Sequence, residues 1–129
     1  MTIQSNEVTV EFLEAFADAW NRHDVDNLMS FMTDGCVFES SGGDGMRGTL
    51  YEGAEAVRKG YAKAWADFPD AQWKNASHFV QGVRGVSEWI FTGTNAEGKR
   101  SEVAGCDIFL FRDGKILVKN SYRKNRSFF

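Results

Sequence analysis

The sequence predicts an α+β domain in which the helices come first and the strands last. Apolar residues recur at helical spacing in the first half of the chain, and the period drops toward two from Ala71 onward. A chain of 129 residues has room for one hydrophobic core, so we expect a single domain over residues 1–129. The helices cover one face of the strand meander, and a strongly bent sheet turns the apolar seam between the layers into a cone.

The first two helices are predicted from apolar spacing and capping residues. Leu13, Phe16 and Trp20 follow one another at three- or four-residue intervals, which predicts an amphipathic helix that Asn6 can cap. A second helix is expected to begin at Asp24, because its carboxylate can accept hydrogen bonds from first-turn amides. We expect this helix to end at residues 33–35, Thr-Asp-Gly.

A glycine-rich loop separates the first expected strand from the third helix. Residues 36–40 are predicted to be a short strand, and residues 40–48 a mobile rim without a phosphate-binding motif. The third helix follows Gly53 and ends where Pro69 forbids continuation. Turn signals then divide the rest of the chain into four hairpin-connected strands, at residues 72–80, 86–94, 100–111 and 116–124.

Composition and charge exclude several classes of function. The net charge is -3 with no basic stripe before the last few residues, so nucleic acid is not an expected partner. No apolar run approaches the ~20 residues that span a bilayer, and the polar start does not have the order of a signal peptide, so we expect a cytoplasmic protein without a membrane partner. Cys36 and Cys106 have neither CxxC spacing nor a histidine cluster, and no nucleotide motif is present, so neither a metal nor an organic cofactor is expected.

Two carboxyl groups are the candidates for acid-base chemistry. Glu39 ends the strand at residues 36–40, where it either lies beside apolar walls and abstracts a proton or points to solvent at the mouth of the loop. Asp107 is the only charged residue between positions 103 and 111, on an otherwise apolar face. A carboxyl in that place must be protonated, be exposed at a bulge, or pair with Lys119 or Arg123 of the neighbouring strand.

Four segments together resemble the nuclear transport factor 2-like superfamily, especially its SnoaL-like polyketide cyclase branch. They are FADAWNRHD at 16–24, LMSFMTDGCVFE at 28–39, YEG at 51–53 and GCDIFLFRDGKI at 105–116. The resemblance covers nearly the whole chain. It implies a cystatin-like cone of three helices on a strongly curved antiparallel sheet, usually a dimer joined through the outer face of the sheet.

Comparison with ketosteroid isomerase, a member of the same superfamily, extends this resemblance to individual residues. Its first-strand motif is similar to residues 34–39 and places Glu39 at the catalytic base, and residues 105–111 place Asp107 at its protonated acid. The tyrosine of its oxyanion hole falls on Phe16, which has no hydroxyl to donate. Ketosteroid isomerisation itself is therefore not expected.

The aromatic content favours a lined pocket or an interface. Phe, Trp and Tyr make up 14% of the residues, more rings than a core of this size requires. Arg123 either faces inward and binds a substrate carboxylate or enolate, or belongs to a solvated basic end of the last strand. His78 is either an acid-base partner or a hydrogen-bonded strand residue. The expected ligand-binding residues are Phe16, Trp20, Trp65, His78, Trp89, Phe91, Phe109 and Arg123.

Two functions are compatible with these patterns. The first is a cofactor-free enzyme of the isomerase, cyclase or dehydratase type, which moves a proton on a small apolar carbonyl-bearing molecule with Glu39 as base and Asp107 as acid or oxyanion donor. The second is a non-catalytic dimeric module that binds a ligand or another protein. We predict that the two carboxyls share one enclosed cavity; carboxyls on opposite faces would favour the module. We also expect a homodimer through the convex sheet face, on which Ile116, Val118 and Tyr122 alternate with other residues of the last strand.

Overall fold

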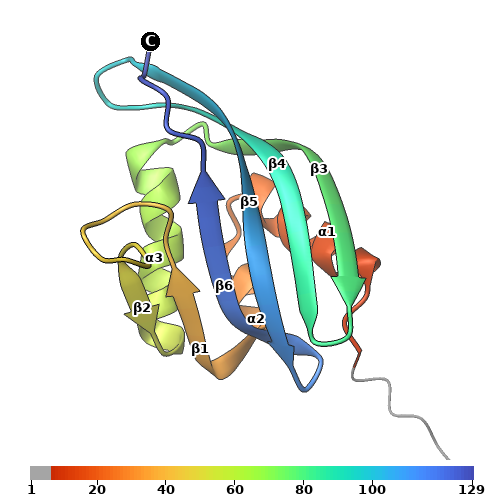
Figure 1. Cartoon of the computed structure of the whole chain (residues 1–129). Coiled ribbons are helices and arrows are strands. Elements are labelled where there is room, and N and C mark those ends of the chain that lie inside the picture. Colours follow the sequence, from red (N-terminus) through yellow and green to blue (C-terminus); the bar gives the residue numbers. More distant parts are fainter. Residues whose placement is uncertain (1–6) are drawn as a thin grey trace, which may run out of the picture.

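The elements of the computed structural model follow the predicted order, with the helices packed on one face of a curved sheet (Figure 1). The structure describes residues 7–129. The helices are α1 (Val10–Asn21), α2 (Val25–Ser30) and α3 (Ala54–Asp67). The strands are β1 (Met32–Glu39), β2 (Leu50–Glu52), β3 (Gln72–Gln81), β4 (Arg84–Thr94), β5 (Arg100–Arg112) and β6 (Lys115–Arg123). The predicted α+β class is confirmed.

The helix ends follow local hydrogen bonding. The hydroxyl of Thr9 accepts a hydrogen bond from the amide three residues later and caps α1. Asn6, the expected cap, lies outside the described residues. Asp24 caps α2 as predicted, because its carboxylate accepts a 3.0 Å hydrogen bond from the amide of Asn27. Gly53, with a φ of +88°, immediately precedes α3. No helix within residues 7–129 combines the length and apolar character that a membrane crossing requires.

The sheet differs from the prediction at its first two strands. Its order is β2-β1-β6-β5-β4-β3, and all neighbours are antiparallel except β1 and β6, which are parallel. β1 begins at Met32 instead of Cys36, because Met32 pairs with Ile116 of β6 and the Thr-Asp-Gly segment continues the strand. β2, which was not predicted, completes this edge of the sheet.

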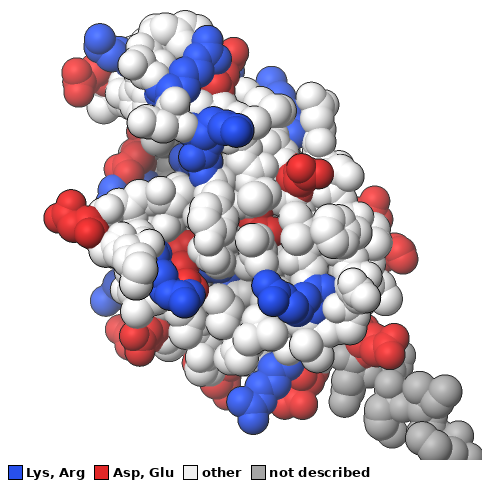
Figure 2. Space-filling view, in the orientation of Figure 1, with Lys and Arg blue, Asp and Glu red and all other residues white. Residues whose placement is uncertain are grey.

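The face of the sheet that points away from the helices carries few charges. Figure 2 shows mostly uncharged side chains over the sheet in this view. Phe79, Ile90, Leu110 and Tyr122 are exposed there. Ile116 does not join them, because a register shift between Leu110 and Phe111 turns Ile116 into the core, where it is fully buried. Its predicted place on the convex face is therefore wrong.

Candidate functional site

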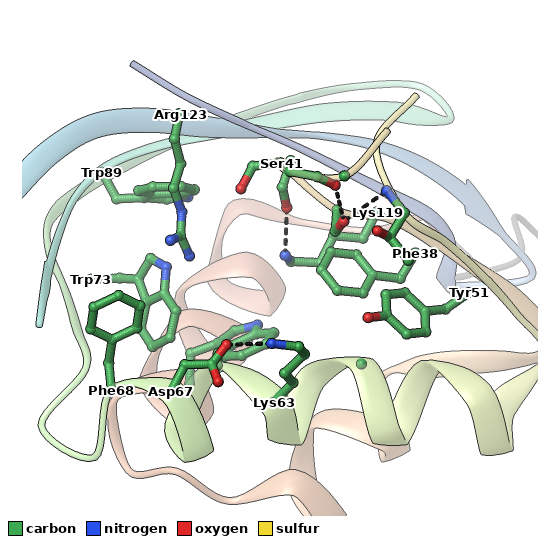
Figure 3. Close-up of a pocket in the computed structure, with 18 residues that line it drawn as sticks. Phe38, Ser41, Tyr51, Lys63, Asp67, Phe68, Trp73, Trp89, Lys119 and Arg123 are labelled. Atoms are coloured by element: carbon green, nitrogen blue, oxygen red, sulfur yellow. Dashed lines mark hydrogen bonds and ion pairs between the residues drawn. The ribbon is translucent and has the colours of Figure 1, made fainter. Parts of the chain in front are cut away.

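A cavity of about 310 Å³ lies between α3 and the inner face of the sheet, beside the start of the loop at residues 40–48 (Figure 3). Six aromatic side chains line it, namely Trp20, Phe38, Tyr51, Phe68, Trp73 and Trp89. An ion pair between Lys63 and Asp67 of α3 lies at its edge. Three further polar residues reach the cavity from alternating positions on β6, namely Lys119, Ser121 and Arg123.

The innermost polar group of the site is a buried ion pair. Nζ of Lys119 lies 3.0 Å from Oδ1 of Asp107, and both residues are buried. Lys119 also donates a 2.8 Å hydrogen bond to the hydroxyl of Ser121, which in turn donates to Asp107 Oδ1. The indole N–H of Trp89 donates to Oδ2 at 3.0 Å. Hydrogen bonds thus engage both carboxylate oxygens, as a buried charge requires.

Lys119 is held among aromatic rings. Its Nζ lies between 4.7 and 5.5 Å from the centroids of three rings, within the range of cation-π attraction. Burial lowers the pKa of Lys119 below its ordinary value; Asp107 opposes this effect, and the charge of Arg123 adds to it. An ammonium has three N–H groups, and Asp107 and Ser121 engage two of them. The third N–H has no hydrogen-bond acceptor among residues 7–129, and Lys119 lines the cavity.

Arg123 is a second cation in the same cavity. In Figure 3 its guanidinium points into the cavity from β6. The guanidinium carbon lies 3.9 Å from the ring centroid of Phe91, and burial lowers the pKa of Arg123. Its Nε is buried without a hydrogen-bond acceptor, and none of the ion pairs formed within residues 7–129 includes it. The prediction of a solvated basic strand end is therefore wrong for this residue.

The structure does not bring Glu39 and Asp107 together. Glu39 pairs with Asn120 of β6, whereas Asp107 pairs with Ser121. Because successive residues of a strand point to opposite faces, the two carboxyls lie on opposite faces of the sheet. Glu39 is buried against the loop and forms a 3.0 Å ion pair with Arg47. The predicted shared cavity is wrong, and with it the pairing of Glu39 as base and Asp107 as acid.

The predicted ligand-binding residues divide into three groups. Trp20, Trp89 and Arg123 line the cavity of about 310 Å³, which we call the main cavity. Phe16, Phe91 and Phe109 belong to the hydrophobic core, and Trp65 packs beside it, stacked on His23. The ring of His78 accepts or donates a 2.6 Å hydrogen bond at the hydroxyl of Ser87 and borders a separate groove next to α1. Three of the eight expected ligand-binding residues thus line this cavity, and their role in binding stays a prediction.

Sequence reasoning did not identify Lys119 as a functional group facing the cavity. It also left out Ser121 and the rings of Phe38, Tyr51, Phe68 and Trp73. The available signal for Lys119 was its alternation with Ser121 and Arg123, but polar alternation ordinarily marks a solvent-facing side. Among the described residues, no three or more His, Cys, Asp or Glu side chains gather as metal ligands would.

Comparison with known proteins identifies the fold and the family. The SnoaL-like domain family matches residues 13–118. No curated protein matches the chain. Among solved structures, a candidate polyketide cyclase from Xanthomonas campestris is 20% identical, with 87% of each chain covered and a TM-score of 0.76. An NTF2-like protein of unknown function from Mesorhizobium loti is 25% identical, with 97% of this chain and 98% of that chain covered and a TM-score of 0.75. TerC, crystallised with polyporic acid, is 17% identical, with 89% and 90% covered and a TM-score of 0.75.

Proposed function

Because the chain belongs to the SnoaL-like domain family, we propose that it is an enzyme that moves a proton on a small carbonyl-bearing molecule, as an isomerase or cyclase does. The observation that carries this proposal is Lys119, a buried amine with a lowered pKa that faces an aromatic cavity. The cavity volume of about 310 Å³ lies at the lower end of the range for small-molecule sites, ~300–1,000 Å³. The similar fold of TerC, crystallised with polyporic acid, supports a flat carbonyl-bearing ligand.

Lys119 is the proton donor and acceptor in this mechanism. Its free N–H donates to the carbonyl oxygen of the substrate, and transfer of that proton leaves a neutral amine. The amine then takes a proton from the carbon next to the carbonyl. One proton leaves carbon, one reaches oxygen, and Lys119 returns to its starting charge. The products are an enol and the unchanged enzyme, so no other reactant is required.

Asp107 is a positioning residue in this scheme. It lies behind Lys119, holds Nζ by an ion pair and does not line the main cavity. Ser121 links the two groups by accepting from Lys119 and donating to Asp107. The lowered pKa of Lys119 brings proton transfer closer to neutral pH, which is the condition for an efficient acid-base group.

One observation favours a second function, a non-catalytic ligand-binding module. Glu39 and Asp107 face opposite sides of the sheet, so the chain does not present two carboxyls to one substrate. A module of this kind uses the same aromatic cavity but makes no use of proton transfer by Lys119. The two functions therefore differ in one measurable property, proton exchange on a bound ligand.

The test is hydrogen-deuterium exchange at the carbon next to the carbonyl of 2-tetralone, followed by NMR in D₂O. We expect the protein to accelerate exchange over its heat-denatured form, and Lys119→Met/Asp107→Asn to lose about 100-fold or more of that acceleration. The double variant leaves no buried charge unpaired. Lys115→Met, an exposed lysine on the same strand, is the matched control and should exchange like the wild type. Binding without accelerated exchange would refute the enzyme and support the module.

A further inference from the structure

Arg123 is the charged group of the cavity that proton transfer does not use. Its Nε is buried without an acceptor, and it has no carboxylate partner among residues 7–129. Asp107, the acid whose charge acts on Arg123, is already engaged by Lys119, Ser121 and Trp89. Arg123 is half-buried, so its desolvation is concentrated at Nε; a partly desolvated cation without an anionic partner in an aromatic cavity offers a site for an anion.

The charges around the cavity leave one positive charge over. Lys119 and Asp107 cancel each other, and Lys63 and Asp67 do the same at the edge. Glu39 faces the other side of the sheet, where Arg47 balances it. The proton shuttle on Lys119 does not alter the total, since the proton stays between the lysine and its substrate. The uncompensated charge is therefore on Arg123, and a ligand with one permanent negative charge matches it.

The geometry of Arg123 selects a planar anion. Its guanidinium carbon lies over the ring of Phe91, 3.9 Å from the ring centroid, which holds the group in place. A guanidinium held in this way presents a fork of N–H donors that matches the two oxygens of a carboxylate. Arg123 and Lys119 are four residues apart on β6, so their Cα atoms are about 13 Å apart at ~3.3 Å per residue. The anionic end and the carbonyl end of one ligand can thus occupy different parts of the cavity.

We infer that the ligand is a flat aromatic acid whose carboxylate binds Arg123 while its rings lie against the aromatic walls of the cavity. Trp73 and Trp89 flank the guanidinium in Figure 3, and the other aromatic lining residues, Trp20, Phe38, Tyr51 and Phe68, supply apolar surface for the rings of the ligand. Only the placement of a carbonyl at Lys119 rests on the proposed function. The contact between carboxylate and Arg123 stands on the unpaired cation alone.

The test compares 2-naphthoate with 2-naphthamide, a neutral ligand of the same shape, by quenching of tryptophan fluorescence. We expect the wild type to bind the acid at least ~10-fold more tightly than the amide, a difference typical of one charge-assisted pair. Arg123→Met should abolish the preference, and Arg123→Lys should keep part of it. Arg126→Met is the matched control, since Arg126 lies on the C-terminal segment, donates to a backbone carbonyl and does not line the cavity.

Three outcomes would overturn the inference. They are equal affinity for acid and amide in the wild type, a preference that persists in folded Arg123→Met, and failure of both probes to bind. If the preference for the acid is lost in Lys119→Met/Asp107→Asn but kept in Arg123→Met, the carboxylate binds Lys119 and not Arg123, and the inference is refuted. If the protein prefers naphthoate but does not accelerate exchange on 2-tetralone, the proposed enzymatic function is refuted and the inference about the ligand stands. If the protein accelerates exchange on 2-tetralone but does not prefer the acid over the amide, the inference of an aromatic acid ligand is refuted and the proposed enzymatic function stands.

Discussion

Replacing Lys119 by methionine should destabilise the fold strongly, because it leaves the carboxylate of Asp107 buried without its cation. Both residues are buried, so solvent screens the pair little. Breaking one side of such a pair costs about 3–5 kcal/mol. At roughly 4 °C per kcal/mol for a domain of this size, Tm should fall by about 12–20 °C. Asp107→Asn should also destabilise, because the amide leaves Lys119 without a counter-ion.

Urea denaturation of both single variants and of Lys119→Met/Asp107→Asn measures the coupling. We expect the double variant to be more stable than the sum of the single changes implies, by about 2 kcal/mol or more, since it removes both charges together. Lys63→Met and Asp67→Asn form the control cycle. That pair is largely exposed and should show a coupling of about 0.5 kcal/mol or less. Additive effects at Lys119 and Asp107 would show that the pair does not act as a unit and would refute the reasoning.

Three further predictions concern the sheet. Burial lowers the pKa of His78, and the charges of Glu14 and Asp107 oppose this effect. The unfolded state therefore binds more protons than the folded state, so stability should fall as the pH drops from 6.5 through the lowered pKa. We expect His78→Gln to flatten the dependence of Tm on pH between about 7 and 5. The protein should be a homodimer through the outer sheet face, with Tyr122→Glu monomeric by light scattering; a monomeric wild type would exclude this interface. Gly105→Ala should cost about 1–3 kcal/mol in urea denaturation, because its Cβ would collide with the backbone oxygen of Tyr122 and lie 2.5 Å from the ring of Trp89; unchanged stability would contradict that packing.

Local signals were sufficient for most of the fold. Asp24 caps α2, Pro69 follows the end of α3, and the turn residues divide the last four strands nearly where they were expected. The early start of β1 and the presence of β2 could not be predicted in this way. β1 is fixed by pairing with β6, which lies at the other end of the chain, and no local pattern reports such a partner.

The face occupied by Glu39 depended on the same long-range pairing. Alternation within the expected strand puts Val37 and Glu39 on one face and Phe38 on the other, but it does not tell which of these faces the helices cover. The pairing of Phe38 with Lys119 and of Glu39 with Asn120 decides this, and it depends on β6. The resemblance to ketosteroid isomerase placed Glu39 at a base, and the register places it on the outer side of the sheet.

Asp107 shows how far physical reasoning on the sequence could reach. By the sequence argument, a lone acid on an apolar strand face had to be protonated, exposed at a bulge or paired with Lys119 or Arg123, and the structure pairs it with Lys119. The register does not distinguish the two cations, because Asp107 lies directly opposite Ser121 and one cation lies two residues away on either side. Arg123 lies opposite Gly105, whose missing side chain leaves room for the ring of Trp89. The guanidinium therefore packs against aromatic rings while Lys119 takes the carboxylate, and this choice leaves the cavity with its unpaired positive charge.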